Sequence, residues 1–280
     1  MIEIVTCTSE HRKVLAALDP YLARELSFHP GIVPGSAVTA VDGSKVVGAG
    51  YLLTGPGRFL HLMFVTDTSA FVGVEAARRL IERLKDVYYA RKKPGEVLRL
   101  WCNANDRRYL KFLKDFGFEE RDIMFRMTRK FSGVHPKPHP NVKPHYLSDR
   151  ASMDAYLAGT EEAFGFPDRE EEMSFRLQFG GGKLYTRVDE ATGENVSFLT
   201  TWPVRKDTAA TENIFTRIPF RNRGYATELI EFAAETLKKE GFANATLNVY
   251  KSDVPAIRLY EKCGYKKTDV MLELWLKKKV

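Results

Sequence analysis

The sequence predicts a mixed α/β fold that occurs twice along the chain. Runs with the alternating apolar pattern of strands stand beside runs with the i, i+3, i+4, i+7 apolar pattern of amphipathic helices. The same order of runs returns after a proline-rich stretch near the middle of the sequence. We therefore expect two α/β domains, each with a mixed sheet covered by helices.

The first half is expected to begin with a helix and a strand hairpin. The helical pattern covers residues 11–28. Two alternating strands, 37–41 and 45–53, are joined at Asp42 and Gly43, a dipeptide typical of hairpin turns.

The second half begins in the same order. Its pattern predicts helices over residues 149–164 and 169–179, followed by strands over 183–188 and 195–204.

An internal repeat links the later parts of the two halves. Phe215 is followed nine residues later by Gly224, and the apolar stripe of a helix comes next. Phe64 and Gly73 have the same spacing before a similar stripe. Each half should therefore continue as a strand, a loop ending in glycine, a helix, a second strand, a short helix stopped by glycine and a closing strand.

A proline-rich stretch separates the two halves. Four of the thirteen prolines fall here, where no helix or central strand can persist. We interpret residues 131–145 as a linker between a first domain, 1–130, and a second domain, 146–280. His135 and His139 have the spacing of metal ligands on one helix, but proline excludes that helix, so we expect no metal.

Composition excludes two classes of protein. Hydrophobic residues make up 44% of the chain and charged residues 28%, and no apolar run is long enough to span a bilayer. We therefore expect neither a disordered chain nor a membrane protein. The first residues lack the features of a secretory signal, and the three cysteines are scattered, so a reducing cytoplasm is the expected location.

The basic charge is concentrated in one half. Residues 1–145 carry 23 basic and 15 acidic side chains, a net +8, whereas residues 146–280 carry a net −1. A basic half could bind nucleic acid, but its charges come in pairs and triples rather than one stripe. This distribution favours a solvated surface over a nucleic-acid site.

The strongest chemical signal is the segment RNRGYA, residues 221–226, between a strand (213–218) and a helix expected to start near Ala226. Backbone N–H groups and the positive end of the helix dipole converge at such a loop and can bind a pyrophosphate. Gly224 lets the backbone approach the phosphates. The segment is neither a Walker loop nor a Rossmann fingerprint, and a plain turn is the alternative.

Residues 212–266 resemble the GCN5-related N-acetyltransferases (GNAT). The acetyl-CoA loop of that family follows the pattern Gln/Arg-x-x-Gly-x-Gly/Ala, which RNRGYA fits. A second hallmark, an Asn followed seven residues later by a Tyr on a helix that ends in Gly-Phe, corresponds to Asp253, Tyr260 and Gly264-Tyr265. Asp253 departs from the usual Asn, and Asn248 stands where some members carry a catalytic Glu. The resemblance implies two tandem GNAT-like acyl-CoA N-acyltransferase domains.

The resemblance also assigns roles to individual residues. The strand would run beside the pantetheine arm of acetyl-CoA and hold the thioester carbonyl, and the loop would hold the pyrophosphate. The implied cofactor-binding residues are Ile214, Phe215, Thr216, Arg221, Asn222, Arg223, Gly224, Tyr225, Ala226, Asp253 and Tyr260. Tyr260 would also protonate the departing thiolate, unless it is a core tyrosine packed beside Ile257.

The residue that deprotonates the amine stays open at this point. Glu212 is the first candidate, and alternation along its strand predicts that it shares a face with Ile214 and Thr216. A solvent-facing strand end is one alternative for Glu212. A proton path through water is another, because the Asn248 amide cannot accept a proton at neutral pH.

The first half is expected to be a degenerate copy. On the repeat register, positions equivalent to Arg221, Arg223, Ala226 and Tyr260 hold Ala70, Val72, Glu75 and Leu113. A Glu at the helix start would repel a pyrophosphate, and Leu cannot supply a proton. Only the second domain is therefore expected to bind the cofactor.

These expectations together describe an N-acetyltransferase without a metal. It would move an acetyl group from acetyl-CoA to a primary amine of a small-molecule acceptor by direct attack. The acceptor pocket would be built from the first helices of the second domain and from residues 164–168. A non-catalytic acyl-CoA sensor is the main alternative, and a nucleic-acid-binding protein is another.

Overall fold

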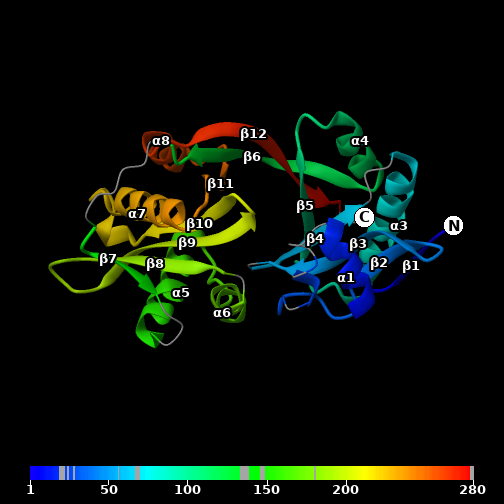
Figure 1. Cartoon of the computed structure of the whole chain (residues 1–280), viewed down its shortest axis with the longest axis horizontal. Helices are drawn as coiled ribbons and strands as arrows, with labels where there is room; N and C mark the ends of the chain where they lie inside the picture. Colours follow the sequence, from blue (N-terminus) through cyan, green and yellow to red (C-terminus); the bar gives the residue numbers. More distant parts are fainter. Residues whose placement is uncertain are drawn as a thin grey trace. The chain divides into compact units, whose positions relative to one another are not determined.

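The computed structural model describes the 280-residue chain except residues 19–22, 24, 28, 56, 67–69, 133–138, 146–148, 180 and 278–280. It divides into two compact units (Figure 1). Unit 1 comprises Met1–Cys102, Asp106–Arg121 and Glu273–Val280. Unit 2 comprises Asn103–Asn105 and Asp122–Leu272.

Unit 1 is built on five strands in the order β1-β2-β3-β4-β5. Strands β1 to β4 pair antiparallel, and β4 pairs parallel with β5. Its elements are β1 (Ile2–Thr6), α1 (Ser9–Leu18), β2 (Val38–Asp42), β3 (Lys45–Thr54), β4 (Phe59–Thr66), α3 (Ala70–Arg91), β5 (Val97–Asn103) and α4 (Arg107–Asp115). Leu80 and Leu84 of α3 are fully buried, and they lie against Gly48 and Gly50 of β3, where an added Cβ atom would be 3.3 Å and 3.0 Å from them, closer than an ordinary contact.

Unit 2 contains the second set of elements, with strands in the order β6-β11-β10-β9-β8-β7. These elements are β7 (Val142–His145), α5 (Arg150–Phe164), α6 (Glu170–Gln178), β8 (Lys183–Val188), β9 (Asn195–Arg205), β10 (Thr208–Thr216), η1 (Ile218–Phe220), α7 (Tyr225–Lys239), β11 (Asn244–Tyr250) and α8 (Val254–Lys262). Only the pairing of β10 with β11 is parallel among the described pairs from β6 to β7.

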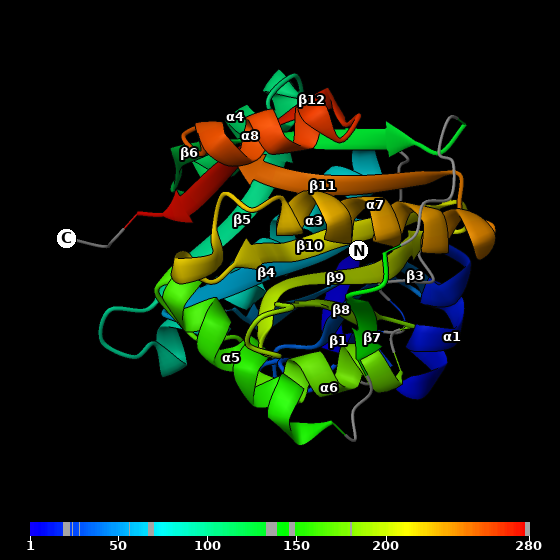
Figure 2. The same cartoon turned by 90° about the vertical axis from the view of Figure 1, so that its left-hand side faces the viewer.

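Helices cover both faces of the sheet in unit 2. Figures 1 and 2 show α7 on one face of β8, β9 and β10, and α5 and α6 on the other. Successive side chains along a strand point to opposite faces of the sheet. Tyr185 and Leu199 therefore pack in the core under α7, and Leu184 and Phe198 pack in the core under α5 and α6. The predicted mixed α/β class is confirmed.

Two long strands carry residues of both units. In β6 (Phe118–Lys130), the first residues belong to unit 1 and Asp122 onward to unit 2; in β12 (Lys266–Leu276), Glu273 onward belongs to unit 1. The units therefore do not follow the predicted division into 1–130 and 146–280. The repeat in the sequence shows the order of strands, but it does not show which strand a closing strand pairs with.

Parts of the predicted linker and of the repeat also differ from expectation. Val142–His145 form β7, an edge strand of unit 2 in which Pro144 is tolerated because one side of the strand is unpaired in the sheet order. His135 lies outside the described residues. Gly73 does not end a loop, because it lies inside α3, which already begins at Ala70.

Most other predicted elements are found within two residues of their expected ends. The helix predicted over 11–28 is an exception, because α1 ends at Leu18, residues 23 and 25–27 are helical, and the others between 19 and 28 lie outside the described residues. The strand predicted over 213–218 is another, because β10 runs from Thr208 to Thr216 and Ile218 lies in η1. Cys7, Cys102 and Cys263 are buried free thiols. In the part of the chain that the structure describes, no helix has the length and apolarity needed to cross a membrane.

Candidate active site

The candidate site begins where β10 and β11 separate. The two strands pair only from Thr208 to Ala210, although β10 continues to Thr216. The pairing of β10 with β9 also shifts register between Glu212 and Phe215, and Asn213 has a φ of 48°. This β-bulge leaves an extra residue outside the regular ladder at the point where the strands diverge.

The bulge turns Glu212 away from the face that alternation predicts. Ile214 packs against the core under α7, whereas the carboxylate of Glu212 lies on the α6 side, 3.9 Å from Arg176. The expectation that Glu212 and Ile214 share a face is therefore wrong. Phe215 packs in the core under α5 and α6, as alternation from Ile214 requires.

The segment from Arg221 to Gly224 forms an exposed loop at the start of α7. Asn222 and Gly224 have positive φ values of 63° and 85°, and Gly224 is the N-terminal cap of α7. Such a loop, followed by the free N–H groups of a first helical turn, forms a concavity that attracts an anion. The helix begins at Tyr225, one residue before the expected start.

Asp189 braces this loop from the turn that follows β8. It is buried and accepts hydrogen bonds from the Tyr225 hydroxyl (2.7 Å) and from Arg223 (3.3 Å). The hydrogen bond from Tyr225 is the main reason why the pKa of Asp189 is lowered. Sequence reasoning missed this residue, because Arg223 and Tyr225 of the loop lie more than thirty positions away from it in the sequence.

Arg221 and Thr216 connect the loop to the end of β10. The Nε atom of Arg221 donates to the backbone oxygen of Thr216 at 3.0 Å, and the Thr216 hydroxyl lies 2.8 Å from that of Ser197 on β9. These contacts tie the proposed phosphate loop to the strand beside it.

The second predicted hallmark lies on α8. Asp253 caps this helix and accepts a hydrogen bond from the backbone N–H of Ala256 at 3.2 Å. Tyr260 is 8% exposed and packs in the core under α7 together with Ile257 and Tyr265. Burial raises the pKa of Tyr260 well above its usual value of 10, so its hydroxyl is protonated at neutral pH.

Glu212 has a raised carboxyl pKa. About 40% of its side-chain surface is exposed, and desolvation of the carboxyl raises its pKa from 4.5 to about 7. Arg176 opposes this rise, and Glu172 and Asp168 add to it. A carboxylate with a pKa near 7 can accept a proton at neutral pH and is not fully ionised beforehand.

A hydrogen-bonded group beside Glu212 fixes the bulge. The amide of Asn213 donates to the Tyr156 hydroxyl (2.6 Å) and to Asp168 (3.0 Å), and Tyr156 donates to Asp168 at 2.6 Å. Asp168 belongs to the 164–168 segment that we expected at the acceptor pocket. Tyr156 and Asn213 were missed, although an Asn in a strand is a signal for a bulge.

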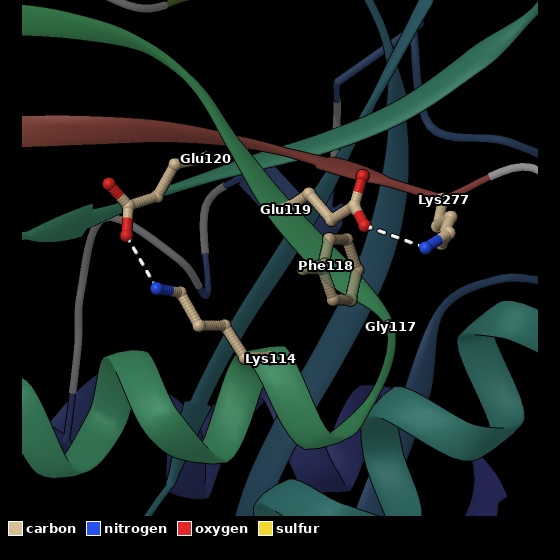
Figure 3. Close-up of a pocket in the computed structure, with 6 residues that line it drawn as sticks. All are labelled: Lys114, Gly117, Phe118, Glu119, Glu120 and Lys277. Carbon is tan, nitrogen blue, oxygen red and sulfur yellow. Dashed lines mark ion pairs between the residues drawn. The ribbon is translucent and has the colours of Figure 1, made fainter.

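A separate pocket of about 440 Å³ lies in unit 1 (Figure 3). It is lined by Lys114, Gly117, Phe118, Glu119, Glu120 and Lys277. Its charged side chains form two ion pairs, Lys114–Glu120 at 2.6 Å and Lys277–Glu119 at 3.0 Å. None of the predicted site residues lines it, so we do not assign the chemistry to this pocket.

The family comparison covers the segment that contains the loop. The Acetyltransferase (GNAT) family model matches residues 153–265, which lie within unit 2 and include the loop, Glu212 and Tyr260. Unit 2 carries a GNAT domain. No curated protein matches the sequence.

Solved structures extend the likeness to the whole chain. A tandem GNAT protein from the clavulanic acid biosynthesis pathway, described as without AcCoA, has a TM-score of 0.72 at 12% identity, covering 100% of both chains. A GCN5-related N-acetyltransferase from Sphaerobacter thermophilus has a TM-score of 0.70 at 15% identity, covering 100% of this chain and 97% of that one. A similar enzyme from Kribbella flavida has a TM-score of 0.63 at 12% identity, covering 94% and 96%. At these identities the likeness concerns the fold, which is the tandem GNAT fold.

The match to the GNAT family model supports acyl transfer as the general activity of unit 2. Among the described residues, no three His, Cys, Asp or Glu side chains form a group that could hold a metal ion.

Proposed function

We propose that unit 2 is an N-acetyltransferase that moves an acetyl group from acetyl-CoA to a primary amine of a small-molecule acceptor. The observation that carries this proposal is Glu212, whose carboxyl has a pKa of about 7 beside the bulge of the cofactor strand. An amine is protonated at neutral pH and must lose a proton to attack, so the reaction needs such a base.

The loop and strand are suited to hold the cosubstrate. The backbone of Arg221 to Ala226 would bind the pyrophosphate at the start of α7, with Arg221 and Arg223 adding positive charge. The backbone of Ile214 to Thr216 would bind the pantetheine arm and the thioester oxygen, because the strand has no parallel partner beyond Ala210. Asp253, which caps α8, would contribute a further contact.

Glu212 and Tyr260 would each carry out one of the two proton transfers of the reaction. When bound, acetyl-CoA supplies an acetyl group as a thioester that an amine nitrogen can attack. Glu212 takes the proton from that nitrogen. Tyr260 donates from its hydroxyl to the sulfur as the carbon–sulfur bond breaks, which a protonated phenol can do. A water molecule between the amine and Glu212 would serve the same path.

A screen of amine acceptors with acetyl-CoA, read out as free thiol, tests the proposal. With an accepted amine, Glu212→Gln should lower turnover at least tenfold at neutral pH, with partial recovery at higher pH as free amine accumulates. Glu171→Gln, on exposed helix surface nearby, is the matched control and should change little. A wild-type pH profile in Glu212→Gln would remove this base, and binding of acetyl-CoA without turnover of any amine would favour a sensor.

A further inference from the structure

Arg176 lies between two carboxylates of unit 2 and contacts them unequally. Its Nη2 atom is 2.5 Å from Oε1 of Glu172, one turn earlier on α6, whereas its Nη1 atom is 3.9 Å from Oε2 of Glu212. The first distance is that of a charge-assisted hydrogen bond, and the second is too long for one. The guanidinium is therefore bonded to the residue that has no part in the proposed chemistry.

A ring contact and an ion pair help to hold Arg176 in this position. Its guanidinium carbon lies 4.2 Å from the centre of the Trp202 ring, a cation–π arrangement with a side chain of β9. Glu172 is 12% exposed in its side chain, so its bond to Arg176 is shielded from solvent more than a surface pair would be. The stack and the ion pair together restrain the guanidinium on the α6 side.

We propose that Glu172 is a positioning residue that keeps Arg176 just beyond hydrogen-bond distance of Glu212, so that Glu212 remains able to accept a proton. This inference rests on the proposed role of Glu212 as the base. It gives a function to the ion pair between Glu172 and Arg176, which takes no direct part in the proposed reaction.

The charges around Glu212 give the sign of the effect. Glu172 of α6 and Asp168 of the loop before α6 raise the pKa of Glu212, and Arg176 of α6 lowers it; Tyr156 of α5 is hydrogen-bonded to Asp168. Loss of Glu172 would remove one negative charge and release Arg176 to bond Glu212 directly. Both changes lower the pKa of Glu212 and make it a weaker base.

Carboxyl NMR titration of the full-length protein tests this without a known acceptor. The Glu212 side-chain resonance is identified by its loss in Glu212→Gln and should titrate near pH 7 in the wild type. In Glu172→Ala we expect that midpoint to fall by about one pH unit or more, and in Arg176→Gln to rise. Glu171→Ala, on an exposed position of the same helix, should leave it unchanged.

The two hypotheses fail in different ways. An unchanged Glu212 midpoint in Glu172→Ala would overturn the positioning role, even if Glu212 proves to be the base. If the midpoint shifts, the acid limb of turnover with an accepted amine should move to lower pH by the same amount in Glu172→Ala, with a lower plateau. Full turnover in Glu212→Gln would instead contradict the proposed function. The NMR titration would still show whether Glu172 sets the pKa of Glu212.

Discussion

The segment from β4 to α4 in unit 1 and the segment from β10 to α8 in unit 2 have the same order of elements but not the same local structure. In both, the parallel strand pair is hydrogen-bonded over only three positions. Residues 217–224 separate β10 from α7, and they include the loop with two positive φ values. In the part of the chain that the structure describes, this loop is a feature of unit 2.

Strand β4 and helix α4 of unit 1 also differ from their counterparts in unit 2, β10 and α8. The pairing of β4 with β3 has no register shift, so unit 1 lacks the bulge of β10. On the repeat register Tyr109 of α4 stands where α8 has Ala256, and its ring lies 6.1 Å from that of Phe64 on β4. The comparison teaches that the order of elements is kept while the register of the strand pair and the side chains of the short helix differ.

The largest expected effect is on turnover when the α8 tyrosine is changed. Tyr260→Phe removes a hydroxyl that is protonated at neutral pH but keeps the ring in the core, so turnover should fall roughly 100- to 10,000-fold while thermal stability changes little. Tyr109→Phe in unit 1 is the matched control and should keep full turnover. Early melting with normal turnover in Tyr260→Phe would show that this tyrosine serves packing alone.

A smaller effect is expected on cofactor affinity when the loop glycine is changed. Gly224→Val puts a branched side chain at a φ of 85° beside the proposed phosphates, so the KM for acetyl-CoA should rise about tenfold or more. Gly95→Val in unit 1 has nearly the same φ, 80°, and equally open space. It controls for backbone strain and should leave the KM unchanged; equal KM values in the two variants would contradict the loop assignment.

The smallest effect concerns stability and pH. Glu212 has a folded-state pKa of about 7 against 4.5 for the free side chain, so the folded protein loses stability as the pH rises from 4.5 through 7. Glu212→Gln removes this loss and should raise Tm by about 2 °C or more at pH 8, with no gain below pH 4.5. Thermal melts at pH 8 and pH 4 measure this, and a gain that is the same at both pH values would refute the raised pKa.

The sequence predicted the local features of the fold well. Apolar periodicity located the strands, and the pattern RNRGYA located a loop that the structure shows at the start of α7. The sequence could not predict that β6 and β12 each contribute residues to both units. The alternating pattern of a strand does not indicate which strand it pairs with.

Long-range contacts explain what the sequence missed in the site. Asn213, which has a positive φ, donates hydrogen bonds to Tyr156 and Asp168, which lie 57 and 45 positions away in the sequence. Alternation therefore gave the wrong face for Glu212. The brace by Asp189 and the ion pair of Arg176 with Glu212 also join residues from different elements.

Titration calorimetry with acetyl-CoA tests most directly the claim that only unit 2 retains the binding features. We expect one site per chain in the wild type, the same site in Gly95→Val, and a strongly weakened site in Gly224→Val. The reason is that, in the described residues of unit 1, β4 pairs with β3 without a register shift and Leu113 stands where α8 has Tyr260. Two sites per chain, or a single site that Gly224→Val leaves intact, would contradict the account.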